Sequence, residues 1–193
     1  MIKKIVLASN NPGKLKEFGQ ILAPFNISLH AQSEFNVPEA EEPFLTFVEN
    51  ALTKARHAAR MTGLPALADD SGLCVNALGG EPGVHSARYA GEPKSDSRNN
   101  QMLVDNLEST QDRSAYYYCV LVYVRSEFDP QPIIADGCWK GEIISEPLGD
   151  KGFGYDPHFW IPSLRKTAAQ LSSDEKNSLS HRGLALRCLL EKL

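Results

Sequence analysis

The stretch "ALADDSGLCV", residues 66–75, places Asp69 and Asp70 at the end of a short apolar run and follows them with a serine and a glycine. The apolar residues on either side predict two short strands, "PALA" at 65–68 and another near 73–78, joined by a turn at "DDSG". Because neighbouring residues of a strand point to opposite faces, we expect one aspartate to face a binding cleft while the other supports the turn. The alternative is that Asp70 and Ser71 only shape a turn before Gly72.

The composition is that of a globular chain. It has 193 residues, 42% hydrophobic and 23% charged, which predicts a single domain over residues 1–193. No stretch approaches the roughly 20 apolar residues of a membrane span. The start "MIKKIVLAS" is too short in its apolar part for a secretory signal, so we expect a cytoplasmic protein with no membrane partner.

Charge and cysteine content exclude further classes. A formal net charge of −4 argues against a nucleic-acid partner held by a broad basic face, although a local basic pocket for a small anion is compatible with it. No C-x-x-C pair occurs, which predicts buried free thiols rather than a zinc site or a redox motif. The four cysteines are Cys74, Cys119, Cys138 and Cys188.

Alternating or continuous apolar runs predict further strands. These are residues 2–8, the segment "ISLHAQ" at 27–32, the two long antiparallel strands 116–124 and 132–144, and a short strand after the glycine-rich loop "KGFGYDPHF".

Helical spacing predicts the remaining elements. Thr46 and Glu49 have the T-x-x-E spacing of a capping box that opens a long helix. A final helical segment starts at Ser173. The expected inward residues of the three internal helices are Leu15, Phe18, Ile21 and Leu22; Phe47, Val48, Ala51, Ala55 and Ala58 or Ala59; and Met102, Leu103 and Leu107.

The segment "SNNPGK", Ser9 to Lys14, lies between a predicted strand and a predicted helix. Free backbone N–H groups at the helix start, a glycine and a lysine are suited to a phosphate group. The segment is not a Walker A loop, because Ala8 stands where that motif has its first glycine. Taken alone, the pattern is more typical of an ordinary strand-to-helix turn.

Carboxylates gather in the loop "EAEE", Glu39 to Glu42, and at Asp69 and Asp70. Magnesium is commonly held by one or two protein carboxylates together with water and substrate phosphate oxygens. A loop glutamate opposite a strand-end aspartate fits that requirement. By itself, "EAEE" is more typical of a solvated acidic loop.

Two helical segments carry polar residues that could bind a ligand. Asn50 and Lys54 are four apart and share a face of the predicted long helix, a spacing also typical of a solvated polar ridge. Lys176 and Arg182 are about 240° apart around a continuous helix at ~100° per residue. If both touch one ligand, the helix must be interrupted between them or they must reach it from different sides.

Seven motifs in order resemble the inosine triphosphate pyrophosphatase family, from residue 5 to about residue 187. They are "SNNPGK", "FVENALTKA", "ADDSGL", "LGGEPGVHSARYAGE", "GFGYDPHF", "KTAAQL" and "EKNSLSHRGLAL". The resemblance implies a mixed α/β (α+β) fold with a long, curved mixed sheet, flanking helices and two lobes around a central nucleotide cleft. It also implies a homodimer and a Mg²⁺-dependent hydrolysis of inosine, deoxyinosine and xanthosine triphosphates to monophosphate and pyrophosphate, which removes aberrant purines.

Carried over by position, the resemblance implies three groups of site residues. Those implied to be catalytic are Asp70, Lys14 and Lys54. Those implied to bind metal are Asp70 and either Glu41 or Glu42, of which Glu42 aligns better by spacing. Those implied to bind substrate are Ser9, Asn10, Asn11, Pro12, Gly13, Lys14, Ser71, Phe153, Gly154, Tyr155, Asp156, Lys176, His181 and Arg182.

One local departure affects the glutamates. The sequence "EEPF" has Pro43 and Phe44 where relatives commonly have "ETG", and proline fixes φ and removes an N–H donor, so the loop can sit differently here.

Chemical roles follow from the resemblance. An isolated aspartate has a pKa of ~3.9, so we expect Asp70 to position metal and water first and to accept a proton second. An acceptor at Asp156 for purine N1–H and a donor near His181 or Arg182 for O6 would exclude adenine.

Two alternatives stay open. One is a nucleotide clean-up enzyme that cuts a different set of modified or pyrimidine triphosphates. The other is a non-catalytic nucleotide-binding module, which would bind tightly without Mg²⁺-dependent turnover.

Overall fold

A computed structural model describes residues 3–25 and 27–193. Its strands are β1 (Lys3–Leu7), β2 (Ile27–Ala31), β3 (Ala66–Val75), β4 (Ser114–Val124), β5 (Ile133–Ile143), β6 (Phe159–Ile161) and β7 (Lys166–Thr167). They form one mixed sheet in the order β2-β1-β3-β4-β5-β6-β7. Its α-helices are α1 (Pro12–Leu22), α2 (Phe47–Thr62), α3 (Asp96–Asn106), α4 (Ser173–Leu179) and α5 (His181–Leu190). The predicted class, a mixed α/β fold with flanking helices, is confirmed. Of the strand predicted at 2–8, residue 2 lies outside the described residues.

The chain divides into two compact units. The first comprises Met1–Asp70, Cys119–Gly137 and Arg182–Leu193, and the second comprises Ser71–Tyr118 and Cys138–His181. Each has its own apolar core. In the first, Phe18, Leu22 and Leu186 pack against residues of β1, β3 and β4. In the second, Tyr117, Trp139 and Phe159 lie among residues of β3, α3 and β6, with ring centroids of Tyr117 and Phe159 4.6 Å apart.

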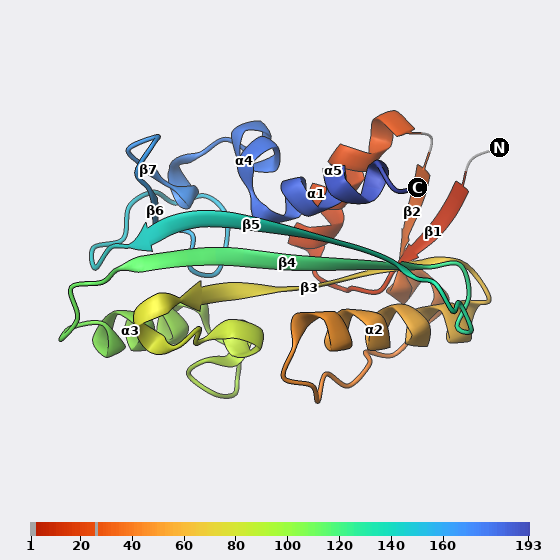
Figure 1. Cartoon of the computed structure of the whole chain (residues 1–193), viewed down its shortest axis with the longest axis horizontal. Helices are drawn as coiled ribbons and strands as arrows, with labels where there is room; N and C mark the ends of the chain where they lie inside the picture. The colour runs from red at the N-terminus through yellow and green to blue at the C-terminus, as the bar shows by residue number, and fades with distance from the viewer. Residues whose placement is uncertain (1–2, 26) are drawn as a thin grey trace. The chain divides into compact units, whose positions relative to one another are not determined.

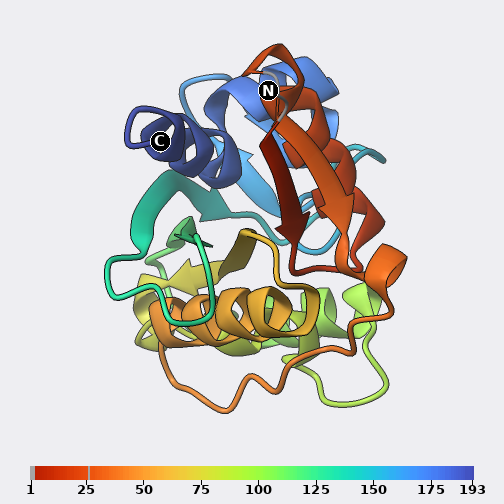
Figure 2. The same cartoon turned by 90° about the vertical axis from the view of Figure 1, so that its right-hand side faces the viewer.

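Within the first unit, β1 pairs in parallel with both β2 and β3. The connection through α1 leads to β2 on one side of β1, and the connection through α2 leads to β3 on the other side. Right-handed crossovers in opposite directions place their helices on opposite faces of a sheet. Figures 1 and 2 show this arrangement, with α1 and α5 on one face and α2 on the other.

The predicted turn at "DDSG" is wrong, because β3 runs without interruption through it. All residues of β3 except Ser71 are buried, as expected for a strand covered on both faces. The strand then ends at Val75 instead of continuing to residue 78, and Asn76–Leu78 form a short 3₁₀ turn. Strand pairing and burial on both faces therefore outweigh the local turn preference of Asp, Ser and Gly.

Helix starts and ends follow the sequence closely. Thr46 is the N-cap of α2, with its side chain accepting a hydrogen bond from the Glu49 N–H. The C-terminal helical segment is interrupted at Ser180, where the backbone is extended, so α4 and α5 are separate helices. If Lys176 and Arg182 both touch one ligand, their spacing called either for such an interruption or for an approach from different sides.

Two residues that we expected to face inward do not. Met102 is 39% exposed while its neighbour Leu103 is fully buried, and Val48 is 36% exposed at the first turn of α2. Both lie at the edge of the apolar face of their helix, where neighbouring positions can differ between buried and exposed.

The four cysteines are free thiols, as expected, but only Cys74 and Cys119 are buried; Cys138 is exposed. Cys138 lies on the solvent side of β5, whose side chains alternate between buried and exposed. Among the described residues, no helix combines the length and apolar character needed to cross a membrane.

Gly72 shows why β3 carries a glycine in its middle. A Cβ built there would lie 2.2 Å from the Gly83 carbonyl oxygen and 2.5 Å from Ser86 Oγ. We expect Gly72→Ala to lower the free energy of unfolding by about 3 kcal/mol, because backbone must move to admit the methyl group. Thermal denaturation would then show a decrease of several degrees in Tm.

Gly19→Ala is the matched control. Nothing lies within 4 Å of a Cβ at Gly19, which is inside α1, so this change should stabilise the protein by about 0.5 to 1 kcal/mol. Equal Tm values for the two variants would contradict the packing role of Gly72.

Candidate functional site

The topology marks a position for a ligand in the first unit. Strand order reverses between β1 and β3, and open α/β sheets bind ligands beyond the carboxyl ends of the strands at such a switch point. β1 ends at Leu7, which pairs with Leu67, whereas β3 continues. Asp69 and Asp70 therefore lie just past the end of β1, beside the segment that leads into α1.

That segment, Ser9 to Lys14, forms a capped helix start. Asn11 is the N-cap of α1, and its Oδ1 accepts hydrogen bonds from the N–H groups of Gly13 and Lys14 at 2.9 and 3.2 Å. The Asn11 N–H in turn donates to Ser9 Oγ. Our expectation of free N–H groups is therefore wrong for Gly13 and Lys14, whose donors Asn11 already satisfies. Lys14 supplies positive charge here, with Asn10 exposed beside it.

Asp69 is the centre of a buried charge network. Its Oδ2 lies 2.9 Å from Lys14 Nζ and 3.7 Å from Arg182 Nε. Arg182 Nη1 also contacts Glu17 Oε2 at 3.0 Å. Burial alone would raise the pKa of Asp69, but the positive charges of Lys14 and Arg182 outweigh it and hold that pKa well below its usual range.

Asp70 points to the other face of β3 and meets α2. Its Oδ1 accepts from Lys54 Nζ at 3.0 Å, and its Oδ2 accepts from Asn50 Nδ2 at 3.4 Å. Lys54 Nζ also donates to Glu42 Oε1, so its ammonium group lies between two carboxylates. Burial raises the pKa of Asp70 despite the attraction of Lys54. Burial would lower the pKa of Lys54, but Asp70, Asp69 and Glu42 together raise it.

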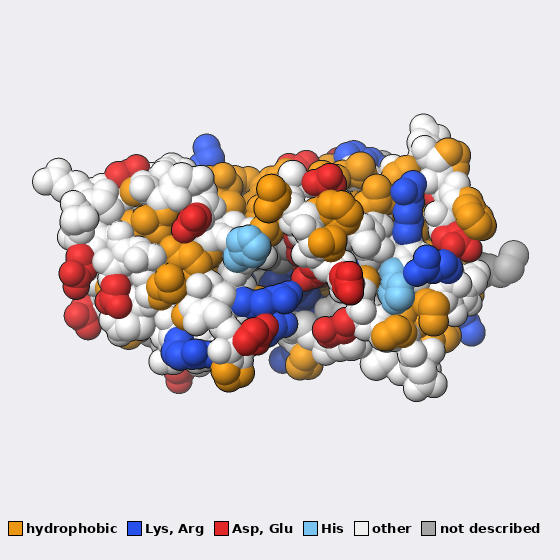
Figure 3. Space-filling view, turned by 90° about the horizontal axis from the view of Figure 1, so that it is seen from below, with side chains coloured by type: hydrophobic (Ala, Val, Ile, Leu, Met, Phe, Trp, Pro, Cys, Tyr) orange, Lys and Arg blue, Asp and Glu red, His pale blue; other side chains and the backbone are white. Residues whose placement is uncertain are grey.

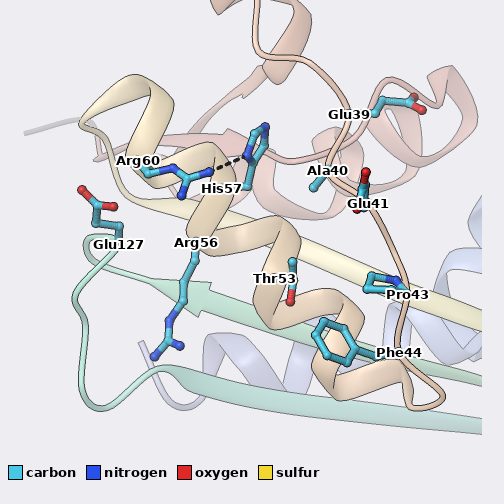
Figure 4. Close-up of a pocket in the computed structure, with 10 residues that line it drawn as sticks. All are labelled: Glu39, Ala40, Glu41, Pro43, Phe44, Thr53, Arg56, His57, Arg60 and Glu127. Carbon is cyan, nitrogen blue, oxygen red and sulfur yellow. Dashed lines mark hydrogen bonds between the residues drawn. The ribbon is translucent and has the colours of Figure 1, made fainter.

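The structure separates Glu41 from Glu42. Glu41 lines a cavity of about 590 Å³, which we call the outer cavity, together with Phe44 of its own loop, Arg56 and His57 of α2, and others (Figure 4). Figure 3 shows basic, histidine and acidic side chains close together over α2 on this face. Because both signs of charge are mixed around the cavity, its lining favours no single class of ligand.

In the second unit, Asp156 and Lys176 form a buried ion pair with an Oδ2 to Nζ distance of 2.6 Å. Asp156 also accepts hydrogen bonds from the Phe153 N–H at 3.0 Å and the Tyr117 hydroxyl at 3.4 Å. Lys176 Nζ lies 4.8 Å from the centre of the Phe153 ring, which is 37% exposed. His181 stacks on Tyr117 with centroids 4.7 Å apart.

The glycine-rich loop of this unit is held from α3. Gly154 has a positive φ of 63°, and its N–H and C=O bond to Asp96 Oδ2 and Asn100 Nδ2 at 2.7 and 3.0 Å. Tyr155 is buried and donates its hydroxyl to the Ser86 carbonyl at 2.7 Å. Asp96, Asn100 and Tyr155 thus fix the loop that presents Phe153.

A family model described as the Ham1 family matches residues 5–192. The chain belongs to the Ham1 family. The resemblance read from the seven motifs is thereby confirmed, with coverage of nearly the whole chain.

Ham1 relatives are similar over full length. A protein of Nitrosomonas europaea named dITP/XTP pyrophosphatase is 62% identical over 192 residues, which cover 100% of this chain and 95% of the relative. One of the same name from Ralstonia nicotianae is 63% identical over 195 residues, covering 100% and 97%.

Solved Ham1 structures are similar in fold. A HAM1 protein of Coxiella burnetii has 50% identity and a TM-score of 0.93, covering 99% of this chain and 100% of that one. The Staphylococcus aureus Ham1 protein has 42% identity and a TM-score of 0.88, covering 98% and 97%.

This Ham1 chain brings most of the predicted site residues into two groups. The first unit joins Lys14, Lys54, Glu42 and Asp70 with Arg182, which lies among the carboxylates of Glu17 and Asp69. The second unit joins Phe153, Asp156, Lys176 and His181. Ser71, the residue after Asp70, is half-buried on β3.

Sequence reasoning missed two contributors. Glu17, one helical turn after Lys14 in α1, pairs with Arg182. The sequence signal for Glu17 was its position three residues after Lys14, which places both side chains on one face of the helix. Asp69, read as a support for the turn, is instead the partner of two cations. The sequence signal for this role of Asp69 was the adjacency of two acidic residues in an apolar run, because each buried carboxylate needs a positively charged partner.

The two aspartates should respond oppositely to neutralisation in magnesium-free buffer. We expect Asp69→Asn to destabilise the protein by about 3 kcal/mol at pH 7, because Lys14 and Arg182 lose their partner. Asp70→Asn should be neutral or stabilising by up to about 1 kcal/mol, because burial disfavours the Asp70 carboxylate. Urea denaturation of both variants measures the difference.

The pH dependence provides the control. A lowered pKa stabilises the folded state above the unfolded value of ~3.9, and this stabilisation is lost as the pH falls below it. The gap in stability between wild type and Asp69→Asn should therefore shrink in acid. A gap that stays constant from pH 7 to pH 3 would contradict the charge network around Asp69.

Proposed function

We propose that this chain is a nucleoside triphosphate pyrophosphatase that hydrolyses inosine, deoxyinosine and xanthosine triphosphates to the monophosphate and pyrophosphate. Support comes from relatives at about 60% identity over the whole chain that are named dITP/XTP pyrophosphatase. The structural observation that carries the proposal is the Lys54 ammonium between Glu42 and Asp70 at the switch point, near Lys14.

Magnesium fits this arrangement. Among the described residues no group of three or more His, Cys, Asp and Glu could hold a metal, but Mg²⁺ needs only one or two protein carboxylates beside water and substrate phosphates. Glu42 and Asp70 are the carboxylates that a shared ammonium already brings together, whereas Glu41 lines the outer cavity. Bound there, Mg²⁺ would neutralise phosphate charge and lower the pKa of a coordinated water.

The chain's own residues then supply positioning and charge. Hydrolysis at the α-phosphorus needs water in line with departing pyrophosphate, and the main difficulty is the negative charge that develops on the phosphate oxygens. Lys14 and Lys54 place ammonium groups there, and the segment Ser9 to Gly13 shapes the approach. The first role of Asp70 is to orient the water, and its second role is to accept a proton from that water. Arg182 holds Asp69 in place, and Asp69 in turn holds Lys14.

The base is assigned to the second unit. Phe153 offers an exposed ring, and Lys176 offers a donor suited to the O6 carbonyl of hypoxanthine or xanthine. Asp156 is 2% exposed and already accepts three hydrogen bonds. We therefore assign Asp156 to positioning Lys176 and Phe153, with His181 packed behind it on Tyr117.

We also propose that the enzyme acts in the cytoplasm as a homodimer, on the basis of the motif resemblance. Sedimentation equilibrium of the purified chain tests the dimer, and fractionation of cells tests the compartment.

The first prediction concerns products. Pyrophosphate and monophosphate should form from inosine and xanthosine triphosphates far faster than from adenosine and guanosine triphosphates, and only with Mg²⁺. Chromatography of the products with and without Mg²⁺ measures this. Primary release of orthophosphate would exclude the proposed reaction, equal rates on pyrimidine triphosphates would favour a different clean-up enzyme, and tight binding without turnover would favour a binding module.

The second prediction concerns the two carboxylates. Asp70→Asn and Glu42→Gln should each lower turnover by roughly 10²- to 10⁴-fold, because each removes a negative charge that positions metal and water. Glu41→Gln is the matched control and should keep most of the activity. Steady-state rates at saturating Mg²⁺ distinguish them. An inactive Glu41→Gln beside an active Glu42→Gln would transfer the metal role to Glu41.

A further inference from the structure

Three side chains of α2 contact the loop that carries the glutamates, residues 36–46, which we call the acidic loop. Asn50 bonds to Phe44, Lys54 bonds to Glu42, and His57 Nε2 lies 2.9 Å from the Pro38 carbonyl oxygen. Positions 50, 54 and 57 are four and three residues apart and share one helix face. The loop thus runs antiparallel to α2 and is held at three successive points.

Asn50 makes the most complete of these contacts. Its Oδ1 accepts the Phe44 N–H and its Nδ2 donates to the Phe44 carbonyl, both at 3.1 Å. The same Nδ2 donates to Asp70 Oδ2 at 3.4 Å. Asn50 is 2% exposed and is the only polar residue among the buried positions of α2, which are otherwise alanines. One amide therefore connects the acidic loop to Asp70.

We propose that Asn50 is a positioning residue that sets the separation between Glu42 and Asp70 and thereby the affinity of the site for Mg²⁺. The inference rests on the proposed function and extends it to a residue that touches neither substrate nor metal. Phe44 is two residues from Glu42, and the intervening Pro43 has a fixed φ, so the connection is short and stiff. His57 holds the loop on the other side of Glu42.

This role differs from simple stabilisation of α2. The helix start is capped by Thr46, and the alanines at positions 51, 55, 58 and 59 supply its packing. A residue needed only for stability would change Tm without changing the response to the cation. Loss of a group that orients metal ligands typically costs 10- to 100-fold in metal affinity or activity.

The test is a Mg²⁺ titration of Asn50→Ala, with Thr53→Ala as control. Thr53 lies on the same helix and lines the outer cavity. Calorimetry without substrate should show Mg²⁺ affinity weakened by about 10-fold or more in Asn50→Ala and unchanged in Thr53→Ala. In turnover assays, the Mg²⁺ concentration for half-maximal rate should rise by a similar factor, while kcat at saturating Mg²⁺ falls less. Hydrogen exchange at the Phe44 amide should accelerate.

The outcomes separate the two proposals. Mg²⁺ affinity within twofold of wild type in a folded Asn50→Ala would overturn the positioning role. If Asn50→Ala does not fold, His57→Ala carries the test and should also weaken Mg²⁺ binding, whereas an unchanged affinity would overturn the proposal. A wild-type chain without Mg²⁺-dependent pyrophosphate release would contradict the proposed function, while the calorimetric titration would still measure what Asn50 does.

Discussion

Two adjacent carboxylates on a strand buried on both faces impose the constraint on which the first unit depends. Their side chains must point in opposite directions, and each needs a cation on its own side. Asp69 receives Lys14 from α1 and Arg182 from α5, and Asp70 receives Lys54 from α2. The charges of one dipeptide therefore tie helices to both faces of the sheet.

Side chains of helix α2 can reach Asp70 because the face that the helix buries carries mostly small residues. Alanines at positions 51, 55, 58 and 59 let its backbone approach the sheet closely, so short side chains suffice to reach β3. The short side chain of Asn50 reaches Asp70 on β3, and the longer side chain of Lys54 spans both Asp70 and Glu42. In the second unit, Asp96 and Asn100, four residues apart on α3, bind the N–H and the C=O of Gly154 in the glycine-rich loop.

Features written in local sequence could be predicted. The N-cap at Thr46 and the helix face shared by Asn50 and Lys54 follow from spacing, and the structure has both. The break at Ser180 is one of the two arrangements that the spacing allowed if Lys176 and Arg182 touch one ligand. Features decided by distant partners could not. The "DDSG" segment has turn-forming residues, yet strand neighbours and two covering layers keep it extended. Arg182 could be assigned to the site from its motif, but its contact with Glu17 depends on packing between α5 and α1.

The uninterrupted course of β3 also limits where residues can be inserted into or deleted from the chain. Inserting or deleting one codon before Asp69 would rotate the rest of the strand to the opposite face, so each aspartate would meet the helix that serves the other. Loops such as residues 126–132 can absorb such changes because no alternation has to be kept there. Length variation among functional descendants of this chain should therefore be absent from residues 66–75 and concentrated in its connections.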